Sequence, residues 1–192
     1  MQALGGLGAD DVLLDYLRKP IASDDPVARF AEQTVRSAAA KALAGSEVPG
    51  VHEALLEAAR EERLPGALEA LVVRDPETAT PILLAALEDD FARDAARAGL
   101  RGRGVDARDA LVEAVLDPGS GWEPSLRRRR VAADLLLEIG IDVDVWRRLE
   151  CALDGAHAQL VCAVGLLGME CSPDPARIAR RLVEILPSVG WE

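Results

Sequence analysis

Apolar residues recur along most of the chain at spacings of three and four, a pattern that predicts amphipathic helices rather than strands. The clearest Leu-rich segments are 12–17, 52–59, 81–89, 109–117, 147–154 and 178–186. Their aligned residues Leu56, Leu84, Val112 and Leu149 stand 28, 28 and 37 positions apart. A period of this size is typical of stacked helical repeats rather than of a bundle.

A second set of segments lies between the first, is richer in Ala and ends in Gly. Its members are 35–45, 92–102, 130–140 and 158–168, with a shorter second helix expected over 64–74. We expect each of the four to be a helix that ends at its glycine, because glycine adopts the left-handed C-cap conformation without steric cost. The unit is therefore predicted to be an Ala/Leu helical hairpin.

Prolines that follow a capping residue mark where helices begin. The dipeptides Asp25-Pro26 and Thr80-Pro81 fit this pattern, and Pro65 and Pro124 are each expected to open a helix.

The hairpins resemble HEAT repeats, in particular the short bacterial HEAT-like repeats first associated with phycobilin lyases. The residues that carry the resemblance are 24–29, 89–96 and the endings 96–102 and 162–168. They are similar to the family pattern Asp-x-x-Val-Arg-x-x-Ala-Ala, although 64–74 lacks the Arg and the 117–124 connection is enlarged. The resemblance implies an all-α, right-handed α-solenoid of about five HEAT-like hairpins plus a terminal helix, in one domain over 1–192.

Residues 3–8 look like the tail of another second helix. Two explanations stay open: the chain is a piece of a longer solenoid, or its natural cap is irregular. A solenoid end without a polar cap exposes core residues, so self-association through such ends is expected.

Composition agrees with helices and indicates the compartment. Hydrophobic residues make up 49% of the chain but aromatic residues only 3%, which favours a core of Ala, Leu and Val. The sequence shows no signal-peptide pattern and no apolar run of the roughly 20 residues that a membrane span needs, so a cytoplasmic protein is expected.

The charge balance argues for a protein partner. Net charge is -11, which disfavours nucleic acid and anionic membranes as partners. Residues 1–91 hold 8 basic and 17 acidic residues, whereas 92–192 hold 14 and 16. The acidic first half is therefore expected to suit a basic partner protein.

The candidate chemical groups have ordinary structural interpretations. Cys151, His157, Cys162 and Cys171 are zinc-ligand types without the short paired spacings of known sites, so reduced core cysteines are expected. The acidic pairs, which are Glu61 with Glu62 and Asp142 with Asp144, are expected to cap helices or lie on solvated faces. No metal site, cofactor or catalytic residue is predicted.

Partner-binding candidates cluster around the enlarged connection. Arg127, Arg128, Arg129 and Arg130 form a run of four cations, and Trp122 precedes them. A helix rotates about 100° per residue, so at most two of the arginines share a face, and the others are expected to pair with acids of neighbouring repeats. Trp122 either belongs to a binding surface, as Trp and Arg often do, or covers an apolar gap between repeats.

The remaining aromatic residues have structural predictions. Trp146 and Phe30 follow the helical period and are expected in the core. Trp191 is expected to fray or to cover the last helix.

The sequence thus favours a non-catalytic interaction scaffold or adaptor. The alternative is an enzyme of the HEAT-like DNA-glycosylase or chromophore-lyase type, which the resemblance alone suggests.

Overall fold

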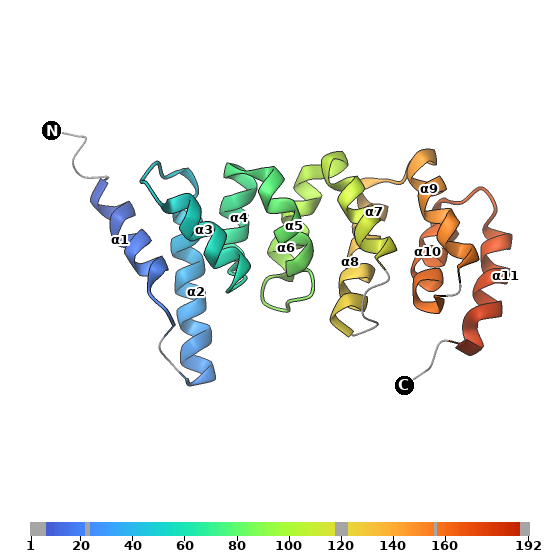
Figure 1. Cartoon of the computed structure of the whole chain (residues 1–192), viewed down its shortest axis with the longest axis horizontal. Helices are drawn as coiled ribbons and strands as arrows, with labels where there is room; N and C mark the ends of the chain where they lie inside the picture. Colours follow the sequence, from blue (N-terminus) through green and yellow to red (C-terminus); the bar gives the residue numbers. More distant parts are fainter. Residues whose placement is uncertain (1–6, 22–23, 118–122, 156, 189–192) are drawn as a thin grey trace. The chain divides into compact units, whose positions relative to one another are not determined.

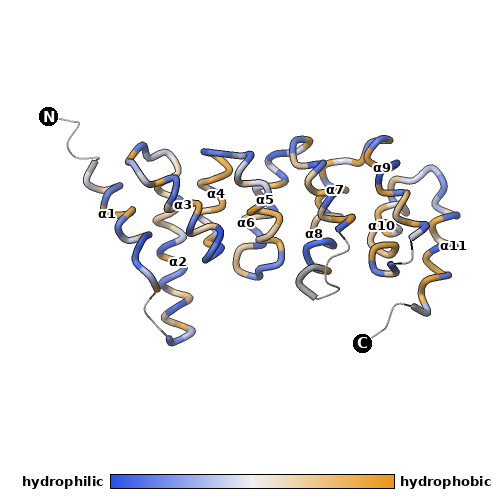
Figure 2. The backbone as a smooth tube through the Cα atoms, in the orientation of Figure 1, coloured by the Kyte–Doolittle hydropathy of each residue, from blue (hydrophilic) through white to orange (hydrophobic). Residues whose placement is uncertain are grey.

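The protein is all-α, as the apolar spacing predicts. The computed structural model describes residues 7–21, 24–117, 123–155 and 157–188, and within these ranges the backbone forms α-helices, short 3-10 turns and loops without a strand. The chain divides into two compact units, residues 1–99 and 100–192. Most of the helices combine hydrophobic and hydrophilic stretches (Figure 2), which gives them a side suited to a core and a side suited to water.

Unit 1 is built from helices that pack against the next helix in sequence or the one after it (Figure 1). Its helices are α1 (Leu7–Arg18), α2 (Pro26–Ala42), α3 (Val51–Arg60), α4 (Pro65–Arg74), α5 (Pro76–Ala86) and the first part of α6 (Arg93–Arg103). The helix α2 packs against α1 and α4, while α4 also contacts α3 and α5. Leu43, Leu55, Leu68 and Leu83 are fully buried between them.

Unit 2 repeats this arrangement. Its helices after α6 are α7 (Arg108–Leu116), α8 (Glu123–Ile139), α9 (Val143–Glu150), α10 (Ala158–Cys171) and α11 (Pro175–Ile185). The helix α8 packs against α7 and α10, and α10 also contacts α9 and α11. Leu111, Leu135, Leu136 and Leu149 are fully buried, and Trp146 is 6% exposed, which confirms its predicted place in the core.

Several helix starts are those that the prolines predict. Pro26 opens α2, and the carboxylate of Asp25 accepts a hydrogen bond from the backbone N–H of Val27. Pro65 opens α4, and Pro124 lies in the first turn of α8. In each case the missing proline N–H falls where a helix has no partner for it.

The start predicted at Thr80-Pro81 is wrong. The helix α5 begins at Pro76, with Asp75 as its N-cap, and Pro81 lies inside it. The reason is that Asp75-Pro76 supplies the same capping pair five residues earlier, while the Thr80 hydroxyl donates to the Pro76 carbonyl at 3.0 Å within the helix.

Only one of the four predicted glycine C-caps is confirmed. Gly140 follows α8 with a φ of 100°, the left-handed conformation that favours glycine. Gly45 ends a 3-10 turn without a positive φ, and Gly102 and Gly168 lie inside α6 and α10. Glycine is needed at position 168 for a different reason, because a Cβ there would lie 2.4 Å from the Trp146 ring. Its lack of a side chain permits close packing instead of ending a helix.

Arginines of second helices bond to the carbonyl ends of the helices before them. The last carbonyls of a helix have no partner within it and carry partial negative charge, so a guanidinium satisfies and stabilises them. Arg36 of α2, Arg93 of α6 and Arg129 of α8 donate to the carbonyls of Leu17, Leu87 and Asp117 respectively. Each of these bonds links the two helices of one hairpin.

Phe30 is not in the core, contrary to the prediction. Its side chain is 58% exposed, and it contacts Phe91 edge-on with ring centroids 5.4 Å apart. The buried residues of α2 begin only at Arg36, because the first half of this helix is not covered by the helices it packs against. Thr34 and Lys41, which share the side of the helix that carries Phe30, are exposed as well, so Phe30 lies on the open face of α2.

The N-cap of α5 makes part of the stability depend on pH. Hydrogen bonding from Thr78 is the main cause that holds the pKa of Asp75 below its ordinary value of 3.8, and His52 contributes. The unfolded chain therefore binds the proton more tightly than the folded protein does. The contribution of Asp75 is complete above pH 3.8 and is lost as the pH falls through the lower folded pKa.

Asp75→Asn is expected to flatten this acid dependence, because asparagine still caps the helix but does not titrate. The measurement is Tm for both proteins between about pH 6 and about pH 2.5. An Asp75→Asn protein with the same acid slope as the wild type would contradict the assignment.

No helix formed by the described residues is long and apolar enough to cross a lipid bilayer.

Candidate functional site

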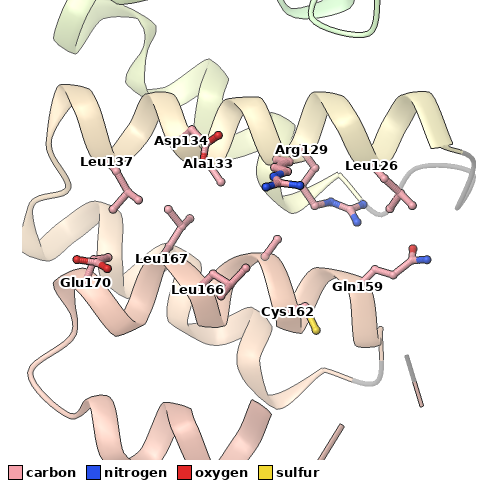
Figure 3. A pocket seen from close by; sticks show the side chains of 12 residues that line it. Leu126, Arg129, Ala133, Asp134, Leu137, Gln159, Cys162, Leu166, Leu167 and Glu170 are labelled. Atoms are coloured by element: carbon pink, nitrogen blue, oxygen red, sulfur yellow. The ribbon is translucent and has the colours of Figure 1, made fainter. Parts of the chain in front are cut away.

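A groove of about 580 Å³ runs between α8 and α10 in unit 2 (Figure 3). From α8 it is lined by Leu126, Arg129, Arg130, Ala133, Asp134 and Leu137. From α10 it is lined by Gln159, Cys162, Ala163, Leu166, Leu167 and Glu170. Each set follows the spacing of one helix face, and each α10 residue stands 33 positions after its α8 counterpart. The two helices therefore present equivalent faces to the groove.

The faces of α8 and α10 that point away from the groove pack against other helices, and this packing fixes the positions of the two helices. On α8, Leu135 and Leu136 are fully buried, and the helix packs against α7. On α10, a Cβ at Gly165 would lie 2.6 Å from Leu182, so the absence of a side chain lets α11 approach closely. The groove faces are the sides of α8 and α10 that these contacts leave open.

The groove is apolar and partly exposed from its centre to the level of Leu137. Leu137 projects from α8 and Leu167 from α10 toward each other (Figure 3). Leu137 is 39% exposed and Leu166 is 66% exposed. Large apolar side chains left open beside one another are a feature of binding surfaces.

Arg129 and Arg130 make one end of the groove cationic. Arg129 is 2% exposed, and its Nη2 donates to the Asp117 carbonyl, but its Nε and Nη1 have no hydrogen-bond partner among the described residues. Burial lowers the pKa of Arg129, Asp117 opposes this shift, and the neighbouring charge of Arg128 adds to it. Arg130 is exposed, and it has no ion pair within the described ranges.

The four arginines are separated as helix geometry requires. Arg129 and Arg130 line the groove, whereas Arg128 forms an ion pair with the Asp117 carboxylate at 2.5 Å. Asp117 belongs to the same hairpin, so for Arg128 the expected pairing with an acid of a neighbouring repeat is wrong. Arg127 is exposed and is not among the lining residues. The predicted site residue Trp122 lies outside the described residues, as does Trp191.

The opposite end of the groove is anionic. Glu170 lies near Leu137 there, and Asp134 lies between the two ends. Both carboxylates are exposed. A ligand along the groove would therefore meet positive charge, then leucines with the Asp134 carboxylate beside them, then the negative charge of Glu170.

The cysteines are free thiols in different surroundings. Cys151 is exposed, so the expectation of a core position is wrong for it, whereas Cys162 and Cys171 are half-buried. Burial raises the pKa of the Cys162 thiol, which lines the groove. Among the described residues, which include His157, no group of three or more His, Cys, Asp or Glu side chains is arranged to hold a metal ion.

The acidic pairs mostly serve as predicted, with one correction. The Asp142 carboxylate caps α9 by accepting from the Val145 N–H at 2.9 Å, and Glu61 is exposed. Glu62 is not on a solvated face, because its carboxylate pairs with the buried Arg36 at 2.6 Å. Burial is the main cause that raises the pKa of Glu62, and Arg36 opposes it.

The sequence of α10 itself carries a signal of the open face. Apolar residues surround this helix on all sides, which is typical of a helix covered on all sides. In unit 2, however, Leu166 and Met169 are exposed at 66% and 44%. An all-round apolar helix with an uncovered face indicates a place for a further element.

Comparison with known protein-family models, with curated proteins and with solved structures finds no match to this chain. The structure alone therefore defines the class of the protein, which is all-α and made of paired helices.

Proposed function

We propose that the protein is a non-catalytic protein–protein interaction scaffold, in which HEAT-like hairpins stack as a right-handed solenoid. Its partner protein binds in the groove between α8 and α10. The observation that carries the proposal is the open apolar part of this groove, where Leu137 and Leu166 lie exposed beside buried Leu167.

Covering these leucines supplies binding free energy. Full burial of one leucine side chain contributes about 1.5–3 kcal/mol, and micromolar affinity requires about 8 kcal/mol. Because Leu166 is 66% and Leu137 39% exposed, covering both contributes about 1.6–3 kcal/mol, and further contacts along the groove supply the rest. The charged ends of the groove then restrict which partners fit, since a buried charge without a counterpart opposes binding.

The net charge of the chain supports a basic partner. Residues 1–91 hold 17 acidic and 8 basic residues, and acids such as Asp11, Asp15, Glu53 and Glu57 are exposed. Their field would attract a positively charged protein and accelerate its association at low salt. Capture of the partner is therefore expected to weaken between about 50 mM and about 500 mM salt.

Leu166→Glu is expected to abolish capture of the partner, because it places a charge in the apolar centre of the groove. The test is affinity capture of the full chain from a lysate of its source cells at low salt, followed by mass spectrometry. Val183→Glu is the matched control, since Val183 on α11 is also 66% exposed and does not line the groove. Both changes are at exposed positions, where the effect on stability is usually within about 0.5 kcal/mol.

One protein retained by the wild type and by Val183→Glu, but lost from Leu166→Glu, is the expected result. Identical captured proteins for all three chains would place the interaction elsewhere. No specific capture by the wild type would count against the interaction proposal as a whole.

A further inference from the structure

The groove is electrically polar along its length. Its cationic end combines Arg129 and Arg130 with the N-terminal halves of α8 and α10, while Glu170 lies in the last turn of α10. The two helices run in the same direction, from Leu126 to Leu137 and from Gln159 to Glu170 (Figure 3). Their dipoles therefore add to the side-chain charges, positive at the first end and negative at the second.

We propose that the groove binds an amphipathic helix of the partner protein, antiparallel to α8 and α10, with a carboxylate at Arg129 and Arg130 and a cation at Glu170. This inference rests on the proposed interaction function and specifies the chemistry of the partner. An antiparallel helix places its negative C-terminal end beside the positive ends of α8 and α10, so its dipole and its side chains both match.

The buried guanidinium of Arg129 is the feature that indicates an anionic group in the ligand. Its guanidinium is almost completely buried, yet Nε and Nη1 have no hydrogen-bond partner among the described residues. A buried cation without full compensation is unfavourable, and a carboxylate brought beside it offsets that cost. Arg130, exposed at the same end, can pair with the carboxylate directly.

The spacing along the groove predicts a pattern in the bound helix. Glu170 on α10 lies level with its α8 counterpart Leu137, and Leu137 stands 7 residues after Arg130. Seven residues are about two helical turns, so the two charged ends lie about 10.5 Å apart along the helix axis. An antiparallel helix would match them with a cation at position i and a carboxylate at i+7. Apolar residues at i+4 and i+3 would lie level with Leu166 and Leu167 between them, while Leu137 lies beside position i.

The length of the groove predicts the length of the helix. Its lining runs from Leu126 to Leu137 on α8, which corresponds to about 16 Å of helix. A segment of about three turns fills this length.

A synthetic helical peptide tests the proposal with the full-length chain. The probe is a capped, fluorescein-labelled peptide of about 15 residues with Lys at i, Leu at i+3 and i+4, Glu at i+7, and Ala or Gln elsewhere. Its affinity is measured by fluorescence anisotropy at low salt. A second peptide with Gln at i and i+7 has the same apolar face without the charges.

Arg130→Gln is expected to weaken binding of the charged peptide about tenfold and to leave the Gln peptide unaffected. Arg180→Gln on α11 is the control, because Arg180 is also exposed but lies outside the groove. A peptide with Lys at i+7 is expected to bind Arg130→Glu better than it binds the wild type. Arg130 and Arg180 are both exposed, so the test does not depend on a variant of buried Arg129.

The native thiol of Cys162 reports the direction of the bound helix. Cys162 stands 33 residues after Arg129 and so lies at the cationic end. A peptide with Cys next to the i+7 Glu is expected to form a disulfide with Cys162 under mild oxidant, which accepts the two electrons released with the two thiol protons. A peptide with Cys next to the i Lys is not expected to do so, and exposed Cys151 serves as the internal control.

The inference is wrong if the charged peptide does not bind, if the two peptides respond equally to Arg130→Gln, or if the disulfide forms from the Lys end. These results separate it from the proposed function. Loss of a cellular partner from Leu166→Glu, together with any of them, would leave the interaction scaffold standing and exclude this helix as its ligand.

Discussion

Replacing Gly66 by alanine is expected to destabilise the protein by at least about 3 kcal/mol and to lower Tm by about 6–12 °C. The helices α2 and α4 approach so closely here that a Cβ on Gly66 would lie 1.8 Å from the Ser37 carbonyl oxygen. It would also lie 2.7 Å from the Ser37 carbonyl carbon. Both are backbone atoms, which cannot rotate away as the end of a side chain can.

Two further contacts of this crossing would be lost when the helices separate. The Gly66 N–H donates to the Ser37 hydroxyl at 2.7 Å, which satisfies one of the free N–H groups in the first turn of α4. Leu68 and Leu71 of α4 are buried and would lose packing as the helix shifts.

Gly45→Ala is the matched control, because a Cβ there has no heavy atom within 4 Å and the residue has no positive φ. The same added methyl group is expected to change stability by no more than about 0.5 kcal/mol. Urea unfolding followed by circular dichroism measures both variants. Free energies of unfolding within about 1 kcal/mol of each other would show that the close crossing of α2 and α4 is wrong.

Arg36→Met is the second change with a large expected effect, about 3 kcal/mol near neutral pH. The Arg36 side chain is 3% exposed, and its Nη2 donates to the Leu17 carbonyl at 2.5 Å and to Glu62 Oε1 at 2.6 Å. Methionine fills a similar volume but leaves both acceptors without this donor. The side chain of Glu62 is 26% exposed, so its charge would be only partly solvated.

The loss caused by Arg36→Met is expected to shrink in acid. Burial already raises the pKa of Glu62 above its ordinary value of 4.5, and Arg36 opposes that rise. Without Arg36 the folded pKa rises further, so the folded protein binds a proton more tightly than the unfolded chain does. Between pH 4.5 and the folded pKa, stability therefore falls as pH rises.

The double variant Arg36→Met/Glu62→Leu separates the ion pair from the packing. Removing both partners leaves no buried charge, so the double variant is expected to be more stable than Arg36→Met alone and to lack its added pH dependence. Chemical unfolding at about pH 7 and about pH 4.5 provides the comparison. A double variant that is less stable than the single one would contradict this account of the pair.

Local features of the fold were predictable because they depend on residues close in sequence. The spacing of Leu and Ala identified the helices, and Asp25 and Asp142 marked their starts through hydrogen bonds to N–H groups two or three residues away. The same local logic failed at Pro81, where two capping pairs competed, and at Gly168, where a distant Trp146 explains the glycine.

The candidate site was only partly predictable. The arginine run drew attention to Arg129 and Arg130, and helix geometry required that the four side chains diverge. The sequence alone did not indicate that Arg129 would bond to the end of α7, or that the face of α10 with Leu166 would lie open beside it. Residues 33 positions apart in sequence meet there only through packing.

The sequence by itself determined the helical class, the hairpin period and the helix starts at Asp25 and Asp142, because i→i+4 hydrogen bonds and caps are local. Only the tertiary structure decided which faces α7, α9 and α11 cover and which they leave open. Burial is a property of neighbours in space, so the groove between α8 and α10, with Arg129 buried and Leu166 exposed, follows from packing rather than from any local pattern.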